Sequence, residues 1–209
     1  DLLKVSSHIR HKNFRKGEFI LKEEDRLNSI VIINKGSVKA FRITPEGREH
    51  ILYVFSEGDF FGEEDLFRDG IATYTVEALE DTKVCMLTKS EFRQILIDNP
   101  SISIKVISEL GERINRLEDA LQSSGSRSVD TRISLLLIDF SKRYGEESLE
   151  GIKVHLPLSR EGLANYLGIA RETISRKLGQ MENEGIISSI NNKTILILDM
   201  DTLKLNAGV

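Results

Sequence analysis

The hydrophobic period changes near residue 90, and this change constrains the fold more than any other feature of the chain. Before it, runs of β-branched and aromatic residues such as "SIVIINKGSVKAFRI" and "EHILYVF" are separated by the turn signals "NKG", "PEG" and "RDG". Such runs predict short strands. Beyond residue 100, apolar residues recur every three or four positions, which is the period of a helix. The chain is therefore predicted to be α+β, with a β domain in its N-terminal half.

Residues 1–98 are predicted to form this β domain. The regular spacing of the short strands favours a small barrel or sandwich, and a plain antiparallel sheet without a cavity is the alternative. The segment "KSEFRQILIDNP" is typical of a short helix, and Pro100 stands where a new helix could begin.

The helix after Pro100 is predicted to join two chains. Its apolar positions alternate in spacing between three and four residues and lie between charged residues, as in the seam of a coiled coil. An identical chain is the simplest partner and gives a two-fold dimer. Packing of this stripe on the chain's own barrel is the alternative. The predicted seam residues are Ile107, Leu110, Ile114, Leu117 and Leu121.

The small polar segment "QSSGSRS", residues 122–128, is predicted to break that helix and to act as a hinge. Residues 99–126 are then the dimerisation helix with its hinge, and residues 127–209 form a second domain. This domain begins with the apolar helix "VDTRISLLLIDFSKRYG" and continues into an extended segment at residues 151–158.

Composition narrows the function classes. The 209 residues are 40% hydrophobic, which suits one large or two small domains. Cys85 is the single cysteine, so an internal disulfide and a four-thiolate zinc or iron–sulfur site within one chain are excluded. A reducing cytoplasm is expected. No apolar run approaches the roughly 20 residues of a membrane span, and no signal-peptide pattern is present. The sequence begins at Asp1 rather than Met, which is consistent with a missing N-terminal segment.

The net charge of −4 does not by itself indicate a nucleic-acid binder, but residues 158–178 carry four cations and two acids. In this basic segment Ser159 is predicted to cap a helix that runs to Leu167. Gly168 and Ile169 form a turn, and a second helix starts near Ala170. This is the pattern of a helix-turn-helix.

Apolar residues fill the predicted interface between the two helices, and the small Ala164 stands where the helices must cross closely. "IISSINNKTILIL" then predicts a hairpin that turns at Asn191-Asn192, the wing of a winged domain. The predicted interface residues are Leu163, Leu167, Ile174 and Leu178.

The second helix is predicted to read DNA bases. Glu172 and Arg176 are four residues apart and share one face with Ser175. Arg can bond guanine O6 and N7, Glu can accept from cytosine N4, and Ser can reach a base or a phosphate. A solvated ion pair on an ordinary helix is the alternative, which the position at the start of a second helix-turn-helix helix disfavours. The full predicted DNA-binding set is Ser159, Arg160, Arg171, Glu172, Thr173, Ser175 and Arg176.

With these residues, the chain resembles the Crp/Fnr family of bacterial transcription regulators. The resemblance covers nearly the whole length of the chain. "KGEFILKEEDRLNSIVIINKGSVKAFRITPEGREHILYVFSEGDFFGEEDLF" looks like the cyclic-nucleotide-binding barrel of the family, a jelly roll (double-stranded β-helix). "NPSISIKVISELGERINRLEDAL" is similar to its dimerisation helix, and "LSREGLANYLGIARETISRKL" to its helix-turn-helix. The resemblance implies an effector-controlled homodimer that binds double-stranded DNA and, if it activates transcription, RNA polymerase.

The resemblance also implies roles for single residues of the recognition helix. Glu172, Ser175 and Arg176 fall on the base-reading E-x-x-S-R of the oxygen sensors, and Arg171 falls on a base-contacting Arg of the cyclic-AMP type. The implied target is a palindrome with TTGA-like or TGTGA-like half-sites, whose centres lie one helical turn apart, about 34 Å.

The nucleotide cassette implied by the resemblance is incomplete. Gly62, Glu63, Leu66 and Phe67 match it, but Ala72-Thr73 stands where the family has the Arg-Ser clamp for the cyclic phosphate. A buried anion without a cation is costly. Leu117-Glu118 replaces the pair that touches the adenine, and Glu24 replaces a Gly. The expected effector is therefore an unknown small molecule other than cyclic AMP in its usual pose.

Other sensing chemistries stay open at this point. An iron–sulfur cluster is not expected, because the cysteines are missing. A haem-dependent sensor of NO or CO is the alternative function, with an axial ligand among His8, His11, His50, Cys85 and Met86. Arg42, Arg48 or Arg68 could clamp another anion, and an apolar ligand or none is also conceivable.

The sequence also bears on two other function classes. No nucleophile–base pair, metal motif or P-loop is found in the sequence, so an enzyme is not expected. An interaction module whose winged domain no longer binds DNA would lack salt-dependent retention on palindromic DNA.

Overall fold

The computed structural model describes residues 9–26, 28–63, 71–126 and 128–209. The chain divides into two compact units, one up to Arg113 and one from Ile114 onward. This division falls inside one long helix, between the two predicted boundaries at residues 98 and 126. In the described parts of the chain, no helix combines the length and apolarity needed to cross a membrane.

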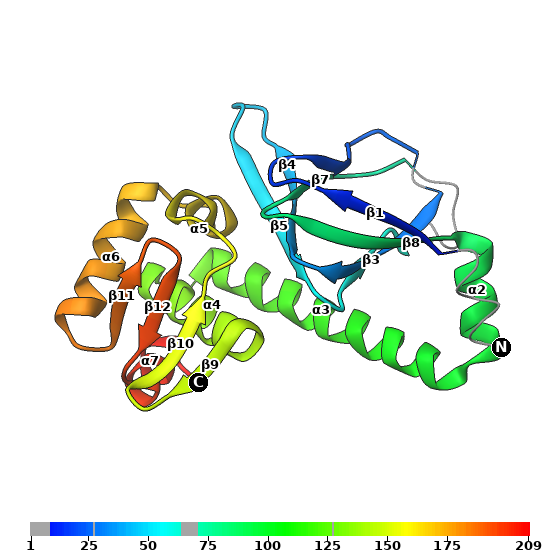
Figure 1. Cartoon of the computed structure of the whole chain (residues 1–209). Helices are drawn as coiled ribbons and strands as arrows, with labels where there is room; N and C mark the ends of the chain where they lie inside the picture. The colour runs from blue at the N-terminus through cyan, green and yellow to red at the C-terminus, as the bar shows by residue number, and fades with distance from the viewer. Residues whose placement is uncertain (1–8, 27, 64–70, 127) are drawn as a thin grey trace. The chain divides into compact units, whose positions relative to one another are not determined.

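The first unit is built on two four-stranded antiparallel sheets, with strand orders β1-β8-β3-β6 and β2-β7-β4-β5 (Figure 1). Strands distant in the sequence pair in both sheets, as in the predicted jelly-roll barrel. The strands are β1 (Arg10–Phe14), β2 (Phe19–Leu21), β3 (Ser29–Lys35), β4 (Ser37–Ile43), β5 (Glu49–Ser56), β6 (Phe60–Phe61), β7 (Thr75–Ala78) and β8 (Thr82–Thr88). Five of the runs anticipated from the sequence are confirmed as strands, whereas β1 and β6 were not anticipated.

Alternating apolar residues of both sheets form the barrel core. Val31, Val38, Phe61 and Val76 are fully buried in one cluster. The alternation of buried and more exposed positions along β7 shows the period of two that places every second side chain inside.

Two helices follow the barrel in the sequence. In α2 (Lys89–Asp98), the hydroxyl of Thr88 accepts from the amide of Glu91, while the Glu91 carboxylate accepts from the amide of Thr88. This capping box satisfies two amides that have no partner within the helix. The next helix, α3 (Pro100–Ser126), begins at Pro100 as predicted.

The predicted break at residues 122–126 is wrong, because α3 remains helical through Ser126. Serine and a single glycine weaken a helix by at most about 1 kcal/mol each, and the segment contains no proline to end it. The next helix is capped by Ser128, whose hydroxyl accepts from the amide of Thr131. Helix α3 thus ends at Ser126 and α4 begins at Val129, directly after the predicted hinge.

The second unit combines helices with a four-stranded antiparallel sheet of order β11-β12-β10-β9. The expected helices after residues 128, 159 and 170 are present. Strand β9 and helix α7 were not anticipated. The elements are α4 (Val129–Tyr144), β9 (Gly145–Ser148), β10 (Gly151–His155), α5 (Arg160–Leu167), α6 (Arg171–Asn183), β11 (Ile187–Asn191), β12 (Thr194–Ile197) and α7 (Met200–Ala207).

The wing hairpin is present, but its turn lies one residue later than predicted. Asn191 still pairs with Thr194, so Asn192 and Lys193 form the turn. The side-chain oxygen of Asn191 accepts from the amide of Lys193 at 2.8 Å. An Asn that bonds the backbone two residues ahead favours the position before a turn, which explains the shift.

Candidate nucleic-acid interface and sensor site

The helix-turn-helix is shaped by local backbone chemistry. The hydroxyl of Ser159 accepts from the amide of Gly162 at 3.2 Å and caps α5, as predicted. The helix ends at Gly168, whose φ of +63° lies in the left-handed region that glycine adopts without strain. Ala170 is extended and precedes α6. The two helices are thereby joined by a turn of three residues, 168–170.

One face of this helix pair is buried and the other is open to solvent. The four predicted interface residues and Ala164 are all buried. The side chains of Arg171, Glu172, Ser175 and Arg176 are exposed on α6. Within the described parts of the chain, none of these four side chains has a hydrogen-bond or ion-pair partner. The predicted base-reading side chains therefore share one free helix surface, as the sequence spacing requires.

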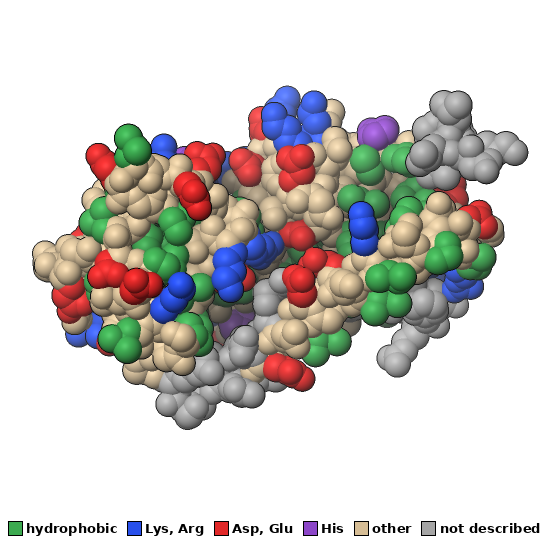
Figure 2. Space-filling model, turned by 90° about the horizontal axis from the view of Figure 1, so that it is seen from below, with side chains coloured by type: hydrophobic (Ala, Val, Ile, Leu, Met, Phe, Trp, Pro, Cys, Tyr) green, Lys and Arg blue, Asp and Glu red, His purple; other side chains and the backbone are tan. Residues whose placement is uncertain are grey.

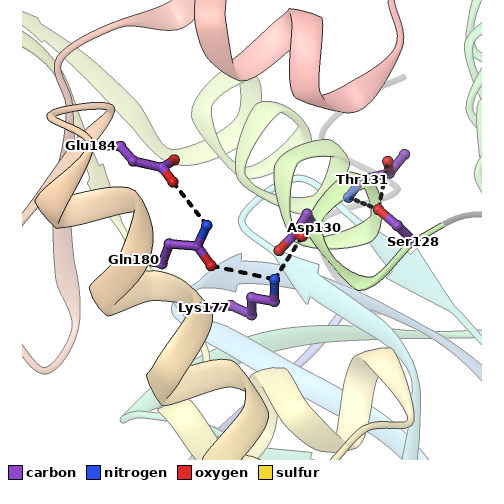
Figure 3. Close-up of polar contacts among 6 residues, drawn as sticks. All are labelled: Ser128, Asp130, Thr131, Lys177, Gln180 and Glu184. Carbon is purple, nitrogen blue, oxygen red and sulfur yellow. Dashed lines mark hydrogen bonds and ion pairs between the residues drawn. The ribbon is translucent and has the colours of Figure 1, made fainter.

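The remaining cation of α6 is held inside the unit. Lys177 Nζ donates to Asp130 of α4 at 2.7 Å and contacts Gln180 Oε1 at 3.4 Å (Figure 3). Gln180 in turn donates to Glu184 at 2.8 Å. The cations of α6 therefore differ in their contacts. Arg171 and Arg176 have no partner among the described residues, whereas Lys177 is paired with Asp130.

Arg160 lies half-buried and reaches the wing rather than standing free. Its guanidinium donates to the hydroxyl of Ser189 on β11 at 2.9 Å. The amide of Ser189 donates to the carboxylate of Glu182 on α6 at 2.8 Å. Two other predicted DNA-binding residues differ from the exposed set. The hydroxyl of Ser159 accepts the capping hydrogen bond of α5, and Thr173 is half-buried.

The sensor cassette keeps the backbone shape that its glycine allows. Gly62 is buried and has a φ of +91°, which L side chains rarely adopt. The next residue, Glu63, is half-buried, and its carboxylate forms an ion pair with Arg113 of α3. Leu66 and Phe67 lie outside the described residues.

Arg113 is the functional candidate that the sequence interpretation missed. Only 8% of this arginine is exposed. Besides Glu63, its guanidinium donates to the carbonyl of Phe60 at 2.9 Å. The guanidinium carbon also lies 5.0 Å from the ring centre of Phe55, 5.4 Å from that of Phe60 and 5.9 Å from that of Tyr53. A cation is thus present at the cassette, but it comes from the helix.

Ala72 and Thr73, which stand where the family has its phosphate clamp, make backbone contacts. Ala72 exchanges backbone hydrogen bonds with Glu24 and Asp25 at 2.9 and 2.8 Å. Arg42, one of the cations considered as a substitute, donates through Nε to the carbonyl of Thr73 and lies 3.9 Å from Glu23. Its side chain is half exposed. Arg48 is exposed, and Arg68 lies outside the described residues.

Glu24 adopts a φ of +72°, the one positive φ outside glycine in the described residues. At the position where the resemblance implies a Gly, the backbone of Glu24 thus adopts a conformation that favours Gly.

The predicted seam divides between two faces of α3. Ile107 and Ile114 are 67% and 55% exposed, and Leu117 is also exposed. Leu110 instead packs, with Val106, against the buried cluster of Ile30, Phe60, Leu87 and Phe92. Packing on the chain's own barrel is thus confirmed for Leu110, and the pairing of the exposed residues with a partner helix stays a prediction. The side chain of Leu121 lies outside the described residues. Figure 2 shows a face on which hydrophobic side chains reach the surface among acidic and basic ones.

Four of the five possible haem ligands lie within the described residues, all on strands of the barrel. His11 Nδ1 on β1 contacts Cys85 Sγ on β8 at 3.3 Å. Met86 packs against the barrel core, and His50 is exposed on β5. Among the residues that the structure describes, no group of three or more His, Cys, Asp or Glu could hold a metal ion. His8 lies outside these residues.

Two protein-family models match the chain. Residues 11–99 match the cyclic nucleotide-binding domain, and residues 131–205 match the Crp-like helix-turn-helix domain. The two matches coincide with the barrel and with the unit that carries the recognition helix.

Curated relatives align over almost the whole chain. The CRP-like cAMP-activated global transcriptional regulator of Mycobacterium tuberculosis is 26% identical over 199 residues, covering 95% of this chain and 88% of the relative. The fumarate and nitrate reduction regulatory protein of Salmonella typhi is 27% identical over 199 residues, covering 95% and 79%.

Solved structures share the fold. A CooA mutant from Carboxydothermus hydrogenoformans superposes with a TM-score of 0.85 at 23% identity, covering 98% of this chain and 90% of the other. FixK2 from Bradyrhizobium japonicum gives 0.81 at 23% identity, covering 94% and 96%. Barrel, recognition helix, family models and relatives agree, and the chain belongs to the Crp/Fnr family of transcriptional regulators.

Proposed function

We propose that the protein acts as a homodimer and recognises a palindrome with TTGA-like or TGTGA-like half-sites. The observation that carries this proposal is the free surface of α6, where Arg171, Glu172, Ser175 and Arg176 lie exposed. Their side chains offer the donors and acceptors that distinguish base edges in the major groove. The hydrophobic side chains exposed on α3 favour a second copy as the partner. DNA binding in turn favours the cytoplasm as the site of action.

The barrel controls DNA binding through an effector other than cyclic AMP in its usual pose. At the clamp position Ala72 offers no cation, and the guanidinium of Arg42 is directed to the carbonyl of Thr73. Proteins with this fold are named for different effectors, including cyclic AMP, CO and c-di-GMP. The fold therefore leaves the effector open.

Sensing of NO or CO through a haem, the alternative, gains no support from the described ligands. His11 and Cys85 contact each other, and Met86 packs against the core. If added haem produced a Soret band whose position depended on one of these side chains, the alternative would displace the effector proposal without affecting DNA recognition.

The test is a titration of the full chain with duplexes that carry the palindrome, one half-site or a scrambled sequence, at several salt concentrations. We expect the palindrome to bind best, with an affinity that falls as salt rises. The Arg176→Ala variant should lose about 1–3 kcal/mol at its guanine and relax the base preference there. Lys204→Ala, at an exposed position of α7, serves as a control for the loss of one positive charge. Equal binding of palindrome and scrambled duplex by the wild type would disprove the proposal.

A further inference from the structure

The outer face of the sheet β1-β8-β3-β6 carries the single cysteine of the sequence beside a histidine. Cys85 of β8 and His11 of β1 are paired across the two strands, and Cys85 Sγ lies 3.3 Å from His11 Nδ1. Val84, the neighbour of Cys85 on β8, is buried in the barrel core, so Cys85 points to the opposite face of the sheet. Cys85 is partly exposed and His11 is exposed, so a small molecule in solution can reach both side chains.

Two lysines lie on the same face of the sheet, one step along the strands from the thiol. Lys83 is two residues from Cys85 on β8 and pairs across the strands with Lys35 of β3. Both lysines are exposed, and within the described parts of the chain neither side chain forms an ion pair or a hydrogen bond. Like charges directly opposite each other on two strands repel and lower stability. A role in attracting negative charge accounts for an arrangement that folding alone does not favour.

We propose that Cys85 is a modification site, at which a small disulfide that carries negative charge forms a mixed disulfide with the protein. The thiolate is the nucleophile in thiol–disulfide exchange, and an imidazole within hydrogen-bond reach can take up the thiol proton. His11 occupies this place beside Cys85. The two lysines attract the anionic reagent from solution to the thiol. This site goes beyond the proposed DNA recognition and does not depend on it.

The reaction balances without a further oxidant. The sulfur of Cys85 attacks one sulfur of the small disulfide, while the thiol proton passes to Nδ1 of His11. A new S–S bond forms between Cys85 and the attacked sulfur, and the S–S bond of the reagent breaks. The departing sulfur leaves as a thiolate and takes the proton from the imidazolium of His11. Cys85 is thereby oxidised and the departing thiol is reduced, so an excess of small thiols reverses the exchange.

Rates of exchange with two coloured disulfides test the role of the lysines. The full chain is treated at neutral pH with dithiobis-nitrobenzoate, which carries carboxylates, and with dithiodipyridine, which is neutral. We expect Lys35→Met/Lys83→Met to react about tenfold more slowly with the anionic reagent and equally fast with the neutral one. Lys12→Met is the matched control. Lys12 pairs with the inward-facing Val84 and so lies on the other face of β1, and its loss should leave both rates unchanged.

His11→Asn tests the role of the imidazole. Asn keeps a polar side chain at this exposed position but cannot take up a proton, so both reagents should react at least about tenfold more slowly at neutral pH. In alkaline solution a free thiol ionises unaided, and the rates of the variant should then approach those of the wild type. A merely structural role of His11 would give no such recovery.

Mass spectrometry identifies the product of the exchange. Incubation of the folded wild type with glutathione disulfide, which carries carboxylates, should add glutathione to the chain, and dithiothreitol should remove it. Cys85→Ser should stay unmodified, because the 209 residues contain no other cysteine.

Three results would overturn the proposal: glutathione disulfide leaves the wild type unmodified, the loss of both lysines slows both coloured reagents alike, or His11→Asn reacts like the wild type at neutral pH. None of these results bears on the binding of the reduced protein to the palindrome, so the two proposals fail separately.

Discussion

Lys177 of the recognition helix and Asp130 of α4 form an ion pair with a distance of 2.7 Å between Nζ and Oδ2 (Figure 3). Asp130 lies two residues after Ser128, which caps α4. The pair therefore ties α6 to the first turn of α4. It also neutralises the cation that follows Arg176 in the sequence.

We predict that Asp130→Asn increases binding to DNA of any sequence. The side chains of Asp130 and Lys177 are 44% and 21% exposed, so the ion pair adds less than about 1 kcal/mol to stability. Its loss frees Lys177 for a phosphate, and the slope of log affinity against log salt should steepen by about one. Glu184→Gln is the matched control, because it removes an acid that contacts Gln180 instead. An unchanged salt slope in Asp130→Asn would contradict this prediction.

The exposed isoleucines of α3 give a prediction about assembly. Ile107→Gln and Ile114→Gln should shift the protein from dimer to monomer in sedimentation equilibrium, since each places a polar group in the proposed apolar seam. Because both side chains are exposed in the single chain, the barrel should keep its stability to within about 0.5 kcal/mol. Ile97→Gln, on α2 and 65% exposed, is the matched control and should leave the dimer intact. A dimer as tight as the wild type in both seam variants would refute the seam.

Replacing Gly168 or Gly179 with Ala should change the stability of the second unit in opposite directions. A Cβ would meet no heavy atom within 4 Å at either position, so backbone conformation alone decides the effect. Gly168→Ala places Ala at a φ of +63° and should cost about 1–2 kcal/mol. Gly179→Ala lies inside α6 and should stabilise the unit by about 0.5–1 kcal/mol. Urea unfolding followed by circular dichroism measures both, and equal effects of the two changes would contradict the role of the turn.

Glu24 supports a prediction of increased stability. Its φ of +72° costs an L residue free energy that glycine does not lose, so Glu24→Gly should stabilise the barrel by up to about 1 kcal/mol. Glu24→Ala removes the same side chain but keeps the strained backbone, and should give no such gain. The comparison is made by thermal unfolding, and a gain in Glu24→Ala equal to that of Glu24→Gly would assign the effect to charge instead of strain.

The recognition helix could be predicted from the sequence because its signals are local. Ser159, Gly168 and the apolar spacing of α5 and α6 act within a few residues of each other, and the exposed face then follows from the helical period. The turn of the wing lies one residue later than predicted, because the side chain of Asn191 bonds the backbone of Lys193.

Arg113 could not be found by looking for a cation near the cassette in the sequence, since it lies fifty residues after Glu63. Its spacing from Val106 and Leu110 was the available signal, because these three residues recur on one helix face. Strand β9 gave no signal at all. All four of its residues are exposed, and only backbone pairing with β10 makes it a strand.

Ser189 connects the wing to both helices of the helix-turn-helix. It accepts from the guanidinium of Arg160 on α5 and donates through its amide to the carboxylate of Glu182 on α6. These two hydrogen bonds connect the hairpin to both helices and favour one fixed arrangement of the three elements on a duplex. The duplex must then supply the adjustment, and deformation is least costly at flexible pyrimidine–purine steps. Operators of this regulator should therefore favour such steps at positions that no side chain touches. Part of its sequence preference then comes from the low energy needed to deform the DNA at these steps.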